Sequence, residues 1–260
     1  MVFKIIGGIL ILALVLITLF FAIFVDSKLI FWYLTDKKSF KNKVTKKYTK
    51  DGKEVLFLGT LHDMHFTFDE YRFNHLKAVL LNYKPDVLLV ESRQTEMDLG
   101  NYADGPIEMF YLSMIARNLS IPVIGIDWFD HKNHKPGTTN KLRDEHIFNN
   151  IVDCILEYKK PLVIIGATHL LVGDKLLKNK GFDNVKLEMD FSKRLFKLVD
   201  EDLVFDKDTV MYLQKRIKRE KYFLDNNDLD DKWSSSINMQ IQNLERFIKK
   251  VETGEVKIDS

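Results

Sequence analysis

The sequence predicts an α/β domain built on a mainly parallel central sheet. From Glu54 onward, short β-rich runs alternate with stretches of helical apolar spacing, which is the pattern of βαβ units. Four of the runs are continuously apolar, as expected for strands covered by helices on both faces. The chain has 260 residues and 46% apolar residues, so it is long enough for one such domain with additional segments.

The predicted elements follow in order along residues 51–204. Proline residues stand just before three of the strands, where a residue without an N–H group is tolerated. Residues 205–260 are charged and helical in pattern, and we expect an extension of amphipathic helices packed on the domain. The predicted strands are 55–58, 87–90, 123–126 and 162–165, with a weaker fifth at 185–189, and the predicted helices are 68–82, 105–119, 141–158 and 170–180.

An apolar segment of 21 residues without a charge, 5–25, follows the short tail 1–4. About 20 apolar residues in a helix span the hydrocarbon core of a bilayer. The segment is longer than the apolar part of a signal peptide, and no small-residue cleavage site follows it. The sequence therefore predicts one transmembrane anchor with the lipid bilayer as its partner; a cleaved signal is the alternative.

The side of the membrane is left open by two opposing patterns. Only Lys4 precedes the segment, whereas the residues just after it include Lys28, Lys37, Lys38, Lys41 and Lys43, and this bias favours a cytoplasmic domain. A short tail before one long apolar segment is also typical of exported, tethered domains, and an extracytoplasmic domain is our expectation. Residues 26–50 are expected to form a basic linker, with contact between Lys37–Lys50 and an anionic leaflet as the alternative.

Composition narrows the class of function. A net charge of +2 gives no reason to expect a nucleic-acid partner. The single cysteine, Cys154, excludes an internal disulfide, and its helical apolar surroundings indicate a core residue rather than a nucleophile.

Titratable residues follow each of the four main predicted strands. The stretches "GTLH" and "GATH" place His62 and His169 in the same context after two strands, while Glu91 and Asp127 directly follow the other two. Sites in open α/β sheets form outside the carboxyl ends of the strands, so these side chains are expected to lie together. A single histidine at such a place is more often structural, but the repeated context favours a functional pair.

Two imidazoles and a carboxylate form a common three-ligand metal set that leaves a position for water. We therefore expect His62, His169 and Glu91 to hold a divalent metal ion or to activate water. Arg143, at the start of a predicted helix, is expected to orient Glu91 or to stabilise an oxyanion. The alternatives are an ion pair of Glu91 with Arg93 or Arg143, and a turn-capping role for Asp127.

Three further residues, Asp127, His65 and Arg93, are candidates for an outer shell around this site, with an ordinary loop position as the alternative for His65. His131 and His134 have the spacing of a metal pair, but their Lys- and Gly-rich surroundings favour a loop.

The order "GTLH", "DVLLVE", Arg143 and "GATHLLVGDKL" resembles the TraB/PrgY/GumN (Tiki-like) family, within the wider erythromycin-esterase-like and ChaN-like superfamily. The resemblance covers residues 54–190 and implies an α/β fold of two related halves with a site formed by His62, Glu91, Arg143 and His169. The sequence departs from the family pattern in two places. It shows no long membrane-embedded C-terminus like that of TraB members, and Asp63-Met64-His65 follows the first motif where many relatives have a small or hydroxyl residue.

The members of this group imply different activities. Tiki-like members imply a peptidase that depends on a divalent metal, with manganese or cobalt favoured over zinc or iron. Esterase-like members imply metal-free hydrolysis, and PrgY-like members imply binding or inhibition of a peptide signal. The sequence thus predicts a membrane-anchored hydrolase of a peptide or small-molecule substrate, with catalytic Glu91 and Arg143; a peptide binder, a metal-free esterase and a haem or iron binder are the alternatives.

Overall fold

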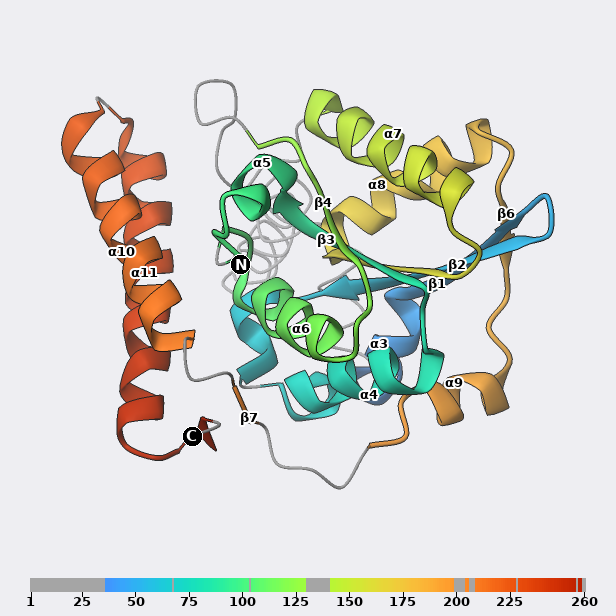
Figure 1. The fold of residues 1–260 in the computed structure, drawn as a ribbon, viewed down its shortest axis with the longest axis horizontal. Helices are drawn as coiled ribbons and strands as arrows, with labels where there is room; N and C mark the ends of the chain where they lie inside the picture. Colours follow the sequence, from blue (N-terminus) through green and yellow to red (C-terminus); the bar gives the residue numbers. More distant parts are fainter. Residues whose placement is uncertain are drawn as a thin grey trace, which may run out of the picture.

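The chain forms an α/β structure around a mixed six-stranded sheet with helices on both faces (Figure 1). The computed structural model describes residues 36–66, 68–102, 104–129, 141–198, 204–205, 209–227, 229–255 and 257–258. The predicted anchor 5–25 and the pair His131 and His134 lie outside these residues. Within them, no helix is long and apolar enough to cross a membrane.

The sheet has the order β4-β3-β5-β2-β1-β6. Strands β4, β3, β5 and β2 are parallel, while β1 is antiparallel to both β2 and β6. The four parallel strands contain the four predicted apolar runs. Their bounds are β2 (Lys53–Thr60), β3 (Val87–Arg93), β4 (Val123–Asp127) and β5 (Pro161–Gly166); the antiparallel pair is β1 (Thr45–Lys50) and β6 (Asp183–Val185).

Helices cover the sheet in two layers. One layer contains α4 (Phe73–Tyr83) and α6 (Ile107–Asn118), and the other contains α7 (Lys141–Glu157) and α8 (Ala167–Asn179). Alternate residues of each strand enter opposite cores: Leu56 and Leu58 face α4 and α6, whereas Val55 and Phe57 face α7 and α8. Both faces of the parallel strands are therefore apolar, which explains the continuous apolar runs.

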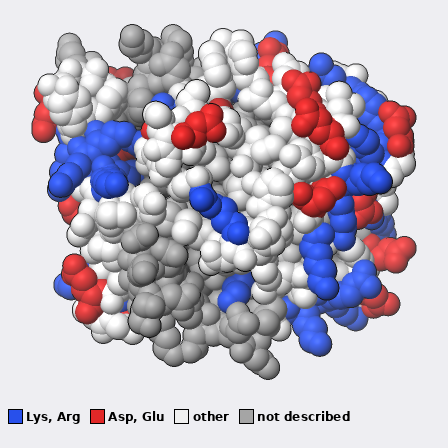
Figure 2. Space-filling view, viewed as in Figure 1, with Lys and Arg blue, Asp and Glu red and all other residues white. Residues whose placement is uncertain are grey.

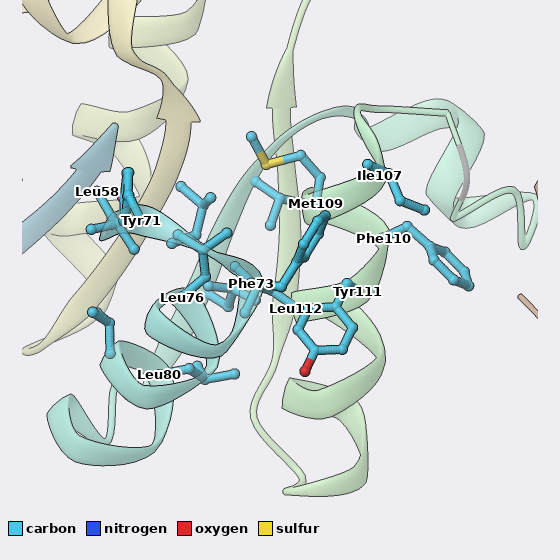
Figure 3. Packing of buried hydrophobic residues seen from close by; sticks show 14 of the residues in the cluster. Leu58, Tyr71, Phe73, Leu76, Leu80, Ile107, Met109, Phe110, Tyr111 and Leu112 are labelled. Atoms are coloured by element: carbon cyan, nitrogen blue, oxygen red, sulfur yellow. The ribbon is translucent and has the colours of Figure 1, made fainter. Parts of the chain in front are cut away.

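The larger core is rich in aromatic side chains. Figure 3 shows Phe73, Leu76 and Leu80 of α4 pointing toward the apolar side chains of α6. Phe73 meets Tyr111 edge-to-face, with ring centroids 5.5 Å apart. Such a contact adds about 0.5–1.5 kcal/mol to the stability from area burial.

Residues 36–50 form structure rather than the expected linker. They build the short helices η1 (Lys37–Ser39) and α3 (Phe40–Lys43) and then the strand β1. Tyr48 of β1 is fully buried, and the turn to β2 places Asp51 and Gly52 at φ values of 51° and 76°. An Asp-Gly pair with both φ angles positive is the favoured two-residue hairpin turn, so β1 is joined tightly to the domain.

The C-terminal extension packs on the domain as two helices lying side by side, α10 (Thr209–Asn226) and α11 (Asp231–Glu252) (Figure 1). Tyr212 of α10 contacts Phe110 of α6 at 5.5 Å, and Phe247 of α11 contacts Phe66 at 5.0 Å between ring centroids. The remaining elements are η2 (His62–Phe66), η3 (Asp69–Tyr71), α5 (Gln94–Asp98), α9 (Met189–Leu195), and a parallel pair of short strands, β7 (Val204–Phe205) and β8 (Lys257–Ile258).

Gly173→Ala is expected to destabilise the fold by about 1–3 kcal/mol, because the added methyl group overpacks a filled core. A Cβ atom at Gly173 of α8 would lie 1.8 Å from Cζ of Phe148 on α7. Urea denaturation checks the change in unfolding free energy. Val172→Ala, at a half-exposed site on the same helix, is the control and is expected to stay within about 1 kcal/mol of wild type. Equal stability of the two variants would contradict the packing argument.

Candidate functional site

Arg143 lies at the centre of a buried cluster beside the carboxyl ends of β3, β4 and β5. Its Nη2 atom donates to Oε1 of Glu91 at 2.9 Å, and its Nε atom donates to Oδ1 of Asp127 at 2.8 Å. Its Nη1 atom lies 3.2 Å from Nε2 of His169. The structure thus brings together four of the predicted site residues, because parallel strands end at the same edge of the sheet.

Glu91 is a buried ionised carboxylate at the end of β3. Its Oε2 atom accepts a hydrogen bond of 2.6 Å from the backbone N–H group of Gly166, and its Oε1 atom lies 3.3 Å from Nε2 of His169. Burial by itself would raise the pKa of Glu91, but the positive charges of His169 and Arg143 hold that pKa well below its usual range. Glu91 is therefore negatively charged at neutral pH.

His169 is held by a second carboxylate that the sequence did not single out. Asp144, buried in the first turn of α7, lies 2.5 Å from Nδ1 of His169. Burial lowers the pKa of His169, but Glu91 and the hydrogen bond to Asp144 outweigh burial and raise it to about 9. His169 is accordingly an imidazolium at neutral pH, bonded to a carboxylate on either side.

The stability of the protein is expected to fall as pH rises from about 6.5 to about 9. The folded state holds the His169 proton more tightly than the unfolded chain, since the pKa rises from 6.5 to about 9. The resulting stability, about 3 kcal/mol at most, is complete below the unfolded pKa and is lost as pH passes through the folded one. Urea denaturation across this range should show a steeper decline for wild type than for His169→Gln. Equal slopes would contradict the assigned charge.

His62 is paired with another residue that the sequence did not assign to the site. Its Nδ1 atom lies 2.8 Å from Oε1 of Glu108, in the first turn of α6. The Glu108 side chain is fully buried, whereas the His62 side chain is 47% exposed. Burial raises the pKa of Glu108, yet its contact with His62 leaves that pKa below its usual value. Glu108 thus accepts a hydrogen bond from Nδ1 of His62, and Nε2 on the other side of the ring points away from Glu108.

The backbone at His62 is held in the left-handed region, with φ of 53°. A side chain other than glycine is uncommon there, and such strain concentrates at functional sites. Gly166 lies beside the ring: a Cβ atom on Gly166 would lie 3.2 Å from Nε2 of His62 and 3.1 Å from Oε2 of Glu91. The glycine of the second "G-x-x-H" stretch therefore lets His62 approach Glu91.

Of the three residues predicted for an outer shell, His65 and Arg93 lie away from the Arg143 cluster. His65 is buried, with Nε2 accepting from the Leu61 N–H group at 2.9 Å and Nδ1 donating to the Tyr71 carbonyl at 2.7 Å. Both ring nitrogens are thereby used within the loop that carries His62. Asp127, the third predicted outer residue, directly contacts Arg143, as described above.

Arg93 belongs to a separate ion cluster. Its Nη2 atom donates to Oδ1 of Asp104 at 2.6 Å, and Arg219 of α10 donates to the same oxygen at 3.0 Å. The two guanidinium groups thus offset the free-energy cost of burying the negative charge of Asp104. The cluster joins the end of β3 to the C-terminal extension.

The donor set expected for a divalent metal is not assembled in this arrangement. The described residues contain no group of three or more His, Cys, Asp or Glu side chains placed to hold a metal ion. The Arg143 guanidinium donates to Glu91 and lies 3.2 Å from Nε2 of His169, so it stands between two of the three predicted ligands. His62, His169 and Glu91 as ligands for manganese, cobalt, zinc or iron remain a prediction.

The fold and these contacts define an α/β protein with two histidines, each paired with a carboxylate, beside the carboxyl ends of the parallel strands. Comparison with protein-family models, with curated proteins and with solved structures finds no match for the chain. The resemblance to the TraB/PrgY/GumN family, and every role that it implies for these residues, therefore remains a prediction.

Proposed function

We propose that the protein is a hydrolase in which His62, held by Glu108, activates a water molecule. The observation that carries this proposal is the contact between Nδ1 of a half-exposed histidine and a fully buried carboxylate. A carboxylate in this position fixes the tautomer of the ring and stabilises the imidazolium that forms when Nε2 accepts a proton. The same pairing of base and carboxylate underlies many hydrolases on unrelated folds.

In the proposed reaction, Nε2 of His62 removes a proton from water as its oxygen attacks the carbonyl carbon of an ester or amide. The carbonyl oxygen becomes negatively charged, and the imidazolium of His62 then returns the proton to the leaving group as the carbon–heteroatom bond breaks. The products are an acid and an alcohol or amine, and His62 is again neutral. Glu108 stays ionised throughout.

Arg143 and His169 supply the positive charges of the proposed site. Each is already bonded to carboxylates, so its orientation is set before substrate arrives. The Arg143 side chain is 15% exposed and that of His169 is 6% exposed, so Arg143 is the more accessible of the two to an oxyanion. Glu91 positions both cations and is not itself accessible, because its side chain is only 5% exposed.

The membrane anchor and the two related halves of the fold belong to this proposal as well. The apolar segment 5–25 supports a hydrolase tethered at a bilayer, and the repeated "G-x-x-H" stretch after β2 and β5 supports an origin in two similar halves. Their support is the sequence pattern alone.

A screen of ester and peptide substrates with the full-length protein tests the proposed function. Hydrolysis by wild type that survives a metal chelator and is lost in His62→Asn would support it. Asparagine tolerates the left-handed backbone at this position but is not a base. Turnover that is unchanged in His62→Asn would contradict the proposal.

Elemental analysis of the same protein separates the metal-dependent form of the prediction from the metal-free one. Stoichiometric metal that disappears in both His62→Asn and His169→Gln, together with loss of turnover in chelator, would replace the proposed water activation by metal-dependent hydrolysis. In that case Arg143 would have to leave the position that it occupies between Glu91 and His169.

A further inference from the structure

A lysine-rich groove lies along the antiparallel edge of the sheet, and neither histidine of the candidate site lines it. It has a volume of about 1370 Å³ and is lined by the segment from α3 into β1 and by the segment from β6 into α9. We call it the β1–α9 groove. Its charged lining residues are Lys41, Lys43, Lys46, Lys186, Lys193 and Glu188.

The lining of the groove carries more positive than negative charge, and its balance stays positive when the neighbouring aspartates are counted. Five lysines and one glutamate line it. Outside the lining, Asp36 lies 2.8 Å from Lys43, and Asp190 lies 3.9 Å from Lys193. Figure 2 shows Lys and Arg side chains, with Asp and Glu among them, on the right-hand side of the molecule where Figure 1 places β6 and α9. The groove thus favours an anionic occupant.

Apolar side chains lie among these lysines. Met189 is 73% exposed and Val185 is 38% exposed, while Phe196 is buried at the inner wall. The ammonium group of Lys41 lies over the Phe196 ring, 5.4 Å from its centroid. Lysines that keep their charge in water while apolar side chains point outward are typical of surfaces that meet the headgroup region of a bilayer.

The position of the groove in the chain indicates which anionic surface it meets. The lining begins at Lys41, and the apolar segment ends at Val25, before the aromatic residues Phe31, Trp32 and Tyr33. Residues 26–35 span about 35 Å at most when fully extended, so a bilayer that holds residues 5–25 is within reach of the groove. Aromatic residues just past an apolar segment are typical of the membrane interface.

We propose that the β1–α9 groove is a docking surface for the anionic phospholipid headgroups of a bilayer. Its lysines contact headgroup phosphates, and Met189 and Val185 enter the interface between them. This inference does not depend on the proposed hydrolase activity. It adds a second contact to the predicted anchor and orients the domain on a leaflet that carries anionic lipid.

Fluorescence of the full-length protein in lipid tests the docking surface. An environment-sensitive probe is attached at Met189→Cys in a Cys154→Ser background, and the protein is reconstituted into phosphatidylcholine alone or with one third phosphatidylglycerol. We expect a blue shift of the probe only with the anionic lipid, and its loss at high salt, because headgroup charges are screened. The same probe at Met239→Cys, an exposed position of α11, is the control and should not shift.

Variants in which lysines are replaced by glutamates test the docking surface in a second way. The combined variant Lys46→Glu, Lys186→Glu and Lys193→Glu should lose the shift, whereas Lys215→Glu with Lys218→Glu on α10 should retain it. Circular dichroism checks that both variants fold. Equal emission in the two lipids, an equal shift at position 239, or a shift that survives the triple reversal would each overturn the proposal.

Discussion

His62→Asn is expected to lower the turnover number of the proposed hydrolase by about 10²–10⁴-fold, the usual contribution of a positioned general base. Asparagine keeps a side chain that tolerates the φ of 53° but cannot accept a proton from water. The Michaelis constant should change little, because the loss falls on the chemical step. Steady-state kinetics on any substrate that wild type hydrolyses measure both quantities.

Glu108→Gln separates a catalytic pair from a structural one. The amide preserves the size of the side chain but removes the charge that stabilises imidazolium at His62. If the two residues act as one unit, the double variant should be no slower than His62→Asn alone. Additive losses, or a Glu108→Gln protein with wild-type turnover, would mean that the buried carboxylate only holds the loop.

Glu91→Gln is expected to destabilise the protein by about 3–5 kcal/mol, the usual cost of removing one partner from a buried charge cluster. The change leaves Arg143 and His169 in the interior without the carboxylate that they share. It should also lower the pKa of His169 below the value of about 9, since Glu91 is the largest factor that raises it. Urea denaturation measures the first effect, and nuclear magnetic resonance titration of the ring measures the second.

Glu96→Gln is the matched control for this variant. Glu96 lies 3.5 Å from Arg93 but its side chain is 26% exposed, so solvent screens the pair and the expected cost is at most about 1 kcal/mol. Similar stabilities of Glu91→Gln and Glu96→Gln would contradict the importance of burial. From the sequence alone, a catalytic Glu91 predicts that Glu91→Gln loses turnover with little loss of stability. The expectation differs because the sequence does not show that Glu91 is buried between two cations.

The sequence correctly located the four parallel strands, because helices on both faces make their residues continuously apolar. It missed β1, where three lysines stand beside the buried side chains of Thr45 and Tyr48. The Asp51-Gly52 turn was the available signal, since that pair favours a tight hairpin. The high lysine content of this segment is equally typical of a linker, and the prediction followed the lysine content rather than the turn.

The sequence likewise located some residues of the candidate site and missed others. The four residues His62, Glu91, Asp127 and His169 were found because each lies at or within three residues of the carboxyl end of a strand, and neighbouring strand ends meet by the geometry of a parallel sheet. Their roles are still predictions. Glu108 and Asp144 were not found, because an acidic residue in the first turn of a helix is already explained by the helix dipole.

The sequence by itself therefore determined the α/β class, the strand positions and the edge of the sheet where charged side chains gather. These depend on periodicity and on chain order, which are local properties. Only the tertiary structure decided that Arg143 stands between Glu91 and His169, and that Glu108 holds His62. Those contacts join residues 26 to 52 positions apart, and they depend on how helices from different units pack around the ends of the strands.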